Sequence, residues 1–157
     1  MKVKNQYLLM AREVTTDMAD QMNSIHKIIE KFGFGVDLSK FRAERSAMKD
    51  KRLAIPIKYA IASSWIFKEK LNKETFVIFR INVFDPEGEN LGGPEQEHLL
   101  PANIDRINMN FNMDALPVTE AGFYKLRAEF LSKAGDVLAK ETYPFEVELK
   151  DEQRADI

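Results

Sequence analysis

The sequence predicts an all-β protein, an antiparallel β-sandwich of seven to eight strands. Three observations lead to this fold class: apolar and polar side chains alternate with period two, turn signals separate the alternating segments, and each segment keeps one polar face. A strand with one polar face is typical of an antiparallel sheet, because parallel sheets are usually covered on both faces.

Four segments carry the alternation most clearly, and we expect each to be a strand with its apolar side buried. They are 75–84, 104–113, 123–131 and 143–149. Further strands are expected at 7–14 and at 53–67, where the larger side chains share one parity and Pro56 marks a break. Residues 85–88, Asp-Pro-Glu-Gly, fit a type I turn, and 133–136 separate two alternating runs at hairpin distance.

Two segments depart from the strand pattern. Apolar residues in 17–33 recur at spacings of four, three, four and three, as on one helical face, with Asp17 as a cap and Gly33 as an end. The same stretch also reads as a strand over 24–34 with an irregular middle. Residues 38–52 hold six basic residues and are expected to form a short helix or a loop.

The length of 157 residues predicts one domain over 1–149, followed by a charged, frayed tail at 150–157. Twenty-three basic and 25 acidic residues give a net charge of −2, which supplies no field to attract nucleic acid or an anionic membrane. The chain has no cysteine, which excludes disulfides and thiolate sites and fits a cytoplasmic protein. The apolar run at 7–11 is too short for a signal-peptide core or a membrane span.

Two features resemble known proteins. Gly122 and Tyr124, which follow Leu116-Pro117-Val118, resemble the corner tyrosine of immunoglobulin-like and fibronectin-like sandwiches, whose hydroxyl bonds back to upstream backbone. Leu126 stands where antibody domains have cysteine, which excludes that class.

The order of segments 7–11, 23–29 and 84–88 resembles an uncharacterised family of bacterial β-sandwich proteins of unknown function. This resemblance implies an immunoglobulin-like sandwich and makes 24–34 a strand rather than a helix. The long basic segment 38–52 departs from the compact connection that the family implies. The resemblance supplies no catalytic residue.

The sequence contains no recognisable catalytic motif. Neither histidine lies beside a nucleophile motif, and His26, in an apolar segment, is expected to be a partly buried structural residue. His98 ends a glycine-rich, acidic loop at 87–98, whose carboxylates offer calcium ligands or simply face water. The spacing of these carboxylates matches no calcium motif, so we predict no metal site. Because no catalytic or cofactor-binding motif is present either, we predict no catalytic residue and no cofactor.

The predicted function is a non-catalytic protein-interaction module that binds another protein or a second copy of itself. The candidate partner surface comprises six residues in two groups: Asn108, Asn110 and Asn112, and Lys40, Arg42 and Arg45. Asparagine is disfavoured in strands, so three on one face either bond a partner, bond neighbouring strands or face water. The basic group either docks a partner or is a solvated charged segment.

The sequence leaves two alternative functions open. A small-ligand or carbohydrate-binding domain would present Trp65 or Tyr59 in an open apolar pocket. A hydrolase with dispersed catalytic residues would have a cleft that holds His98 beside a serine, or paired carboxylates.

Overall fold

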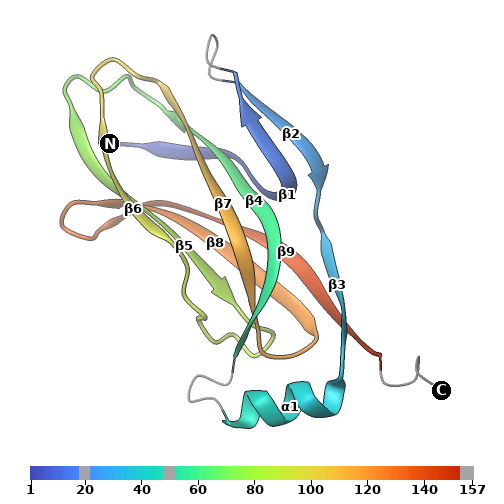
Figure 1. The fold of residues 1–157 in the computed structure, drawn as a ribbon. Helices are drawn as coiled ribbons and strands as arrows, with labels where there is room; N and C mark the ends of the chain where they lie inside the picture. The colour runs from blue at the N-terminus through green and yellow to red at the C-terminus, as the bar shows by residue number, and fades with distance from the viewer. Residues whose placement is uncertain (18–21, 48–51, 153–157) are drawn as a thin grey trace.

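The structure is a computed structural model of the chain and describes residues 1–17, 22–47 and 52–152. Within these residues, nine strands and one helix build two sheets packed face to face (Figure 1). The elements are β1 (Val3–Thr16), β2 (Asn23–Ile28), β3 (Lys31–Val36), α1 (Leu38–Ala47), β4 (Leu53–Phe67), β5 (Thr75–Phe84), β6 (Glu95–Leu100), β7 (Arg106–Val118), β8 (Gly122–Ser132) and β9 (Val137–Asp151). The prediction of a mostly β, sandwich-like structure is confirmed, but the predicted number of seven to eight strands is too low.

One sheet has four strands in the order β2-β1-β4-β7, and the other has five in the order β3-β9-β8-β5-β6. All pairs are antiparallel except β3 with β9, which run parallel from Lys31 opposite Glu146 to Val36 opposite Asp151. The prediction of a purely antiparallel sandwich is wrong at this pair. The chain leaves β2 in one sheet and enters the other as β3 without reversing, so β3 meets β9 in the same direction (Figure 1).

The helical interpretation of 17–33 is wrong, and the strand implied by the family resemblance is confirmed as two strands, β2 and β3. Near the end of β2, Lys27 has a positive φ of 57°, and between the two strands the Ile29 N–H donates to Met10 O at 2.8 Å. This irregular crossover shifts the side-chain parity, and the shift produces the helix-like spacing. Of the apolar residues with this spacing, Phe32 is buried whereas Met22 is 60% exposed, so they do not share one buried face. Met18 lies outside the described residues.

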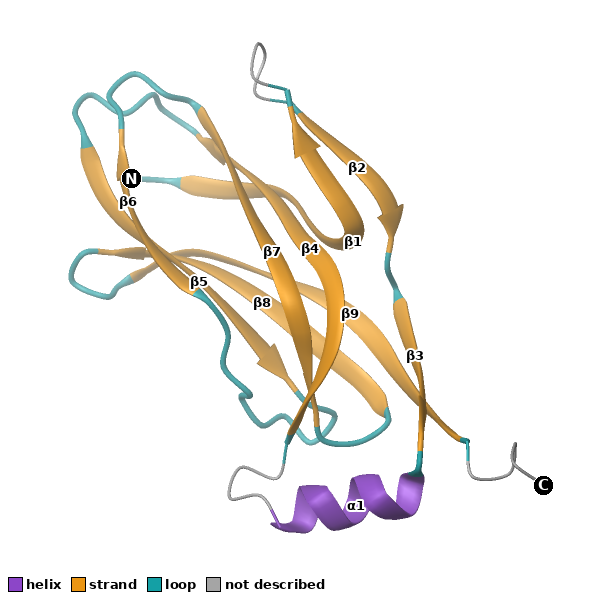
Figure 2. Ribbon diagram, in the orientation of Figure 1, coloured by secondary structure: helices purple, strands orange, loops and turns teal. Residues whose placement is uncertain are grey.

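Residues 38–47 of the uncertain basic segment form the helix α1, which lies across one end of the sandwich (Figure 2). Asp37 caps it: its carboxylate accepts the Lys40 N–H at 3.1 Å and its backbone carbonyl accepts the Phe41 N–H at 2.8 Å. Phe41 is the helical side chain that reaches the core. This helix is not long and apolar enough to cross a membrane.

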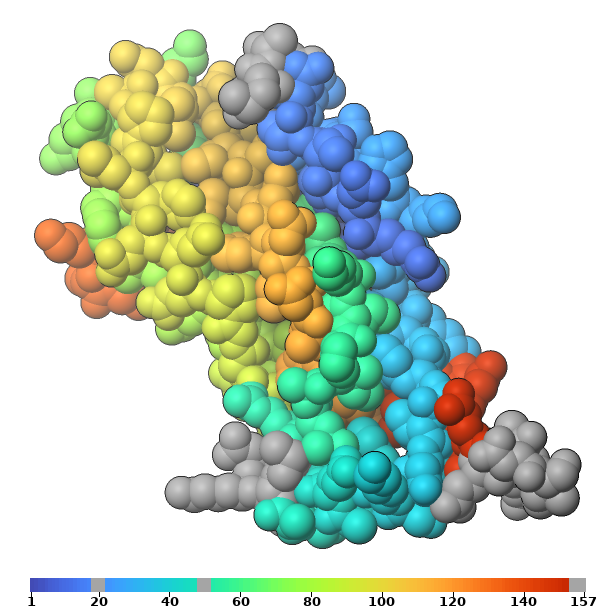
Figure 3. All heavy atoms as spheres, viewed as in Figure 1, coloured from blue at the N-terminus to red at the C-terminus, as the bar shows by residue number. Residues whose placement is uncertain are grey.

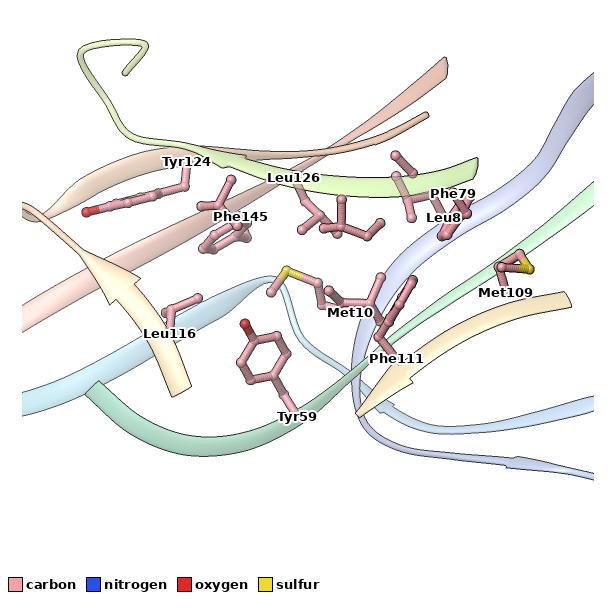
Figure 4. Close-up of a cluster of buried hydrophobic side chains, with 14 of the residues drawn as sticks. Leu8, Met10, Tyr59, Phe79, Met109, Phe111, Leu116, Tyr124, Leu126 and Phe145 are labelled. Atoms are coloured by element: carbon pink, nitrogen blue, oxygen red, sulfur yellow. The ribbon is translucent and has the colours of Figure 1, made fainter. Parts of the chain in front are cut away.

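The core lies between the sheets and consists mainly of apolar residues from the alternating strands, joined by Phe41, Leu71 and Leu91 from outside them. Trp65 packs edge-on against Phe130 at 4.8 Å and Phe79 at 5.7 Å between ring centroids. Toward the other end, Tyr124 stacks on Phe145 at 5.4 Å. Figure 4 shows such side chains from both sheets pointing toward each other. Burial of large aromatic side chains is the main stabilising contribution of such a core.

A buried serine interrupts this apolar set for a specific reason. Ser63 Oγ donates to Met109 O at 2.7 Å and accepts the indole N–H of Trp65 at 2.9 Å. The serine therefore satisfies the one polar atom of the buried tryptophan.

The expected acidic loop at 87–98 is a strand in its second half. Residues 95–98 belong to β6, which pairs with β5 from Arg80 opposite Glu95 to Thr75 opposite Leu100. β6 is an edge strand with few side chains in the core, so its sequence is polar and does not show the alternation that predicts a strand.

Tyr124 makes the upstream bond that the resemblance to immunoglobulin-like sandwiches implies. Its hydroxyl donates to Glu120 O at 2.6 Å and accepts the Thr119 N–H at 3.1 Å. At the other boundary of the domain, β9 continues to Asp151, so the first residues of the expected tail pair with β3.

Candidate functional site

The three asparagines lie on the outer face of the four-stranded sheet, on β7. Across the β4–β7 pair, Asn108 stands opposite Ser64, Asn110 opposite Ala62 and Asn112 opposite Ala60. The central strand β4 thus presents only small side chains beside the asparagine stripe.

A hydrogen-bond network ties the stripe to the β1–β2 hairpin. Asn110 Nδ2 donates to Asn23 Oδ1 at 2.9 Å, and Asn23 Nδ2 donates to the hydroxyl of Tyr7 at 2.7 Å. Thr16 Oγ1 also donates to Asn23 Oδ1, at 2.9 Å. These bonds join β2 to β7 although β1 and β4 stand between them in the sheet order.

The hairpin reaches β7 because β1 changes partners along its length. β1 pairs with β4 as far as Ala11, and beyond that point only with β2. The far half of the hairpin therefore folds over the small side chains of β4. This arrangement agrees with the burial of Ala60, Ala62 and Ser64, which face outward from the sandwich.

Beside this network lies a groove of about 1220 Å³. Its lining includes the hydroxyl of Tyr7 and the amides of Gln6, Asn23 and Asn110. Three cationic residues and one acidic residue also line it: Lys68, Lys70, Arg106 and Asp105. The groove thus combines polar groups with apolar side chains such as Ile66 and Ile104, and it has an excess of positive charge.

β7 is also an edge strand and, with thirteen residues, far longer than the other edges. β2, β3 and β6 have six residues each. β7 contains no lysine, and its single proline, Pro117, stands next to its last residue. Lysines, prolines and short length are the usual protection of an edge against pairing with other chains, and the first eleven residues of β7 lack all three. Figure 3 shows β7 as a stripe beside β4 on the visible surface.

Two hydrogen bonds establish which backbone groups of β7 face outward. Asp105 O accepts the Phe67 N–H at 2.9 Å, and Met109 O accepts from Ser63 Oγ at 2.7 Å, so both carbonyls point toward β4. Backbone groups of successive strand residues point to opposite sides. The N–H and C=O groups of Asn110 and Asn112 therefore point away from β4, to the open side of the sheet.

The basic group lies elsewhere. Lys40, Arg42 and Arg45 are on α1, at the end of the sandwich opposite the groove (Figure 1). Lys40 Nζ is 3.9 Å from Glu44 Oε1 in an exposed i,i+4 pair, and such pairs stabilise a helix only slightly. The structure therefore does not bring the two halves of the candidate partner surface together.

The histidines and the acidic segment do not form a reactive cluster with each other. His98 Nε2 is 3.1 Å from Gln96 Oε1, an amide oxygen that cannot act as a nucleophile. His26 is exposed on the edge strand β2, opposite Glu13, so the expectation of a partly buried histidine is wrong. Glu95, Glu97 and His98 lie on β6, away from the turn that contains Glu87.

Carboxylate oxygens of Asp85, Glu87 and Glu120 lie within 4.8 Å of one another. The buried Asp85 is satisfied by the protein itself. Its Oδ1 accepts the N–H groups of Glu87 and Glu89 at 3.0 and 2.8 Å, and its Oδ2 accepts the hydroxyl of Thr119 at 2.9 Å. This cluster braces the turn after β5 against the Tyr124 corner.

Trp65 and Tyr59, the candidate ligand-binding aromatics, are closed in the core at 0% and 2% exposure. Burial raises the pKa of Tyr59 to about 12, and its hydroxyl donates to Ala115 O at 3.2 Å. The open aromatic pocket expected for a carbohydrate-binding domain is therefore not formed by these two residues.

No family model and no curated protein matches the sequence. Among solved structures, a β-glucosidase from Listeria innocua in complex with glucose is 8% identical, with a TM-score of 0.46 over 96% of this chain and 16% of that one. A GH3 β-glucosidase from Bifidobacterium adolescentis is 10% identical, with a TM-score of 0.38 over 60% of this chain and 16% of that one. A putative ApaA protein from Bordetella pertussis is 12% identical, with a TM-score of 0.26 over 62% and 89% of the two chains. This chain thus spans 16% of either β-glucosidase, and likenesses this distant carry no argument about function.

Proposed function

We propose that this protein is a non-catalytic protein-interaction module that binds an extended segment of a partner by strand addition to β7. In strand addition, a segment joins the open edge of a sheet, and its backbone exchanges hydrogen bonds with the edge strand. Side-chain contacts on either face of the sheet then give specificity.

The observation that supports this proposal is the length and openness of β7. Its thirteen residues form an edge of the four-stranded sheet, with the backbone groups of Asn110 and Asn112 directed outward. The network of Asn110 with Asn23 fixes that side chain beside the edge. The positively charged groove borders the same strand, so an acidic side chain of the incoming segment would gain favourable contacts with Arg106 and Lys68.

The test is a proline placed where only the outward N–H is lost. Asn112→Pro removes a donor from the open edge and leaves the β4–β7 ladder intact, whereas Asn112→Ala removes the side chain and keeps the donor. Peptides selected from a random display library on the wild-type protein should bind Asn112→Ala but lose affinity for Asn112→Pro. Equal binding to both variants, or no selected peptide that is sensitive to the proline, would contradict strand addition.

A second candidate function is the binding of a small polar ligand or carbohydrate in the groove. The groove favours it through its hydroxyl and amide lining, which can exchange hydrogen bonds with sugar hydroxyls. Titration of a mono- and oligosaccharide panel against Asn23→Ala and wild-type protein would test this reading, since a groove ligand should lose affinity for the variant.

We further propose an immunoglobulin-like class for the sandwich and membership of the uncharacterised bacterial family that it resembles. The bond of the Tyr124 hydroxyl to Glu120 O supports the first. A cytoplasmic location is proposed from the absence of cysteine in the sequence.

A further inference from the structure

We infer that the segment received by the β7 edge is the β7 strand of a second copy of this chain, in an antiparallel pair centred on Asn110. The inference rests on the proposed function, because it names the partner of the same edge. The result is a two-fold dimer in which the two four-stranded sheets join into one.

The backbone directions restrict the register of such a pair. The even-numbered residues of β7 direct their backbone groups outward, so the strands bond only when even-numbered residues stand opposite each other. A two-fold axis at Asn110 meets this condition. It places Asn110 opposite Asn110 of the second copy, where the two residues exchange N–H···O bonds across the axis.

Charge complementarity selects this register from the others. Arg106 and Asp114, both exposed, stand four residues on either side of Asn110. With the axis at Asn110, Arg106 of each copy stands opposite Asp114 of the other, so two opposite-charge pairs form at the ends of the interface. A slip by two residues would place Asn112 or Leu116 opposite Arg106, and both charge pairs would be lost.

The side chains on the core side also match in this register. Apolar Met109 stands opposite Phe111 and Ile107 opposite Met113 on the core side, and Ile107 and Met113 are only half-buried in the single chain. Pairing would cover their exposed parts.

The edge of the other sheet on the same side is less suited to self-pairing. β6 contains Glu95 and Glu97 and neither lysine nor arginine, so two antiparallel copies of it would bring acidic side chains together without a cationic partner. This contrast favours β7 as the self-associating edge.

The first test measures the mass of the full chain by light scattering over a concentration series, with a charge swap. The wild type should move from 18.1 kDa toward twice that mass. Arg106→Asp alone and Asp114→Arg alone each create two like-charge pairs and should weaken the dimer about tenfold or more. The double variant restores opposite charges in the exchanged order, so its dissociation constant should return close to that of the wild type. Circular dichroism and thermal unfolding verify that each variant is folded.

The second test reads the register directly. The chain has no cysteine, so single cysteines can be introduced without a background. Asn110→Cys should cross-link to itself with bismaleimidoethane, because the two sites meet at the axis. Asn112→Cys alone should not, because its two sites lie about 14 Å apart along the strands. Asn112→Cys mixed with Asn108→Cys should cross-link, since these positions stand opposite each other.

The outcomes separate the inference from the proposed function. A chain that stays at 18.1 kDa at every concentration, or a dimer that the single charge variants do not weaken, would overturn the β7–β7 pair. If proline-sensitive peptides still bind in either case, strand addition to β7 stands with a different partner. If they do not, the proposed function fails as well.

Discussion

Replacing Tyr124 by phenylalanine removes a single buried hydroxyl from the corner before β8. The hydroxyl donates to Glu120 O at 2.6 Å and accepts the N–H groups of Thr119 and Glu120 at 3.1 and 3.2 Å. Each hydrogen bond contributes about 1 kcal/mol, and a buried polar group left without a partner costs about 1–3 kcal/mol. We therefore expect Tyr124→Phe to lower the free energy of unfolding by about 2–3 kcal/mol.

The assay is urea-induced unfolding followed by the fluorescence of Trp65, the single tryptophan, which is fully buried in the folded state. Tyr143→Phe is the matched control, because it loses one bond, to Ile29 O at 2.7 Å, from a half-buried site. We expect that control to lose about 1 kcal/mol. A Tyr124→Phe protein that is no less stable than the Tyr143→Phe protein would refute the assignment of the corner as a stabilising element.

Two further predictions concern buried polar groups. Ser63→Ala leaves the indole N–H of Trp65 without its acceptor, so the free energy of unfolding should fall by about 1–3 kcal/mol. Urea titrations followed by circular dichroism measure this change. An unchanged midpoint would contradict a stabilising role for the hydrogen bond between Ser63 and Trp65. Because burial raises the pKa of Tyr59 from 10.0 to about 12, its contribution to stability is complete below pH 10 and is lost as the pH rises toward 12. The loss of stability should reach about 3 kcal/mol. Tyr59→Phe should therefore make the free energy of unfolding fall less between pH 10 and 12. If the variant and the wild type lose stability equally over this range, Tyr59 is not the group responsible.

The sequence predicts the strands well wherever one face is buried. In β5 and β8, the alternation identifies Phe79 and Phe130 as core residues, because a period of two is a direct consequence of strand geometry. It does not predict which strands pair. The parallel β3–β9 pair depends on where the chain crosses between the sheets, after Ile28, and no hydrophobic pattern marks that crossing.

The candidate site is predicted only in part. The unusual asparagine stripe singles out Asn110, but its partners Asn23 and Tyr7 come from the β1–β2 hairpin, 87 or more residues earlier in the sequence. Asn23 lies in the 17–33 segment, whose periodicity favours a helix, so no local signal places it over β4. The outward direction of the β7 backbone is likewise invisible in the sequence, since it depends on the register with β4.

The most direct test of the account is residue-resolved amide hydrogen exchange along β7, measured by NMR at low and high protein concentration. The amides of Met109 and Phe111 point toward β4 and should be protected at both concentrations. The amides of Asn110 and Asn112 point outward and should exchange rapidly in the dilute protein but become protected as the concentration rises. If Asn110 and Asn112 stay unprotected at high concentration and also with selected peptides, β7 is not a docking edge.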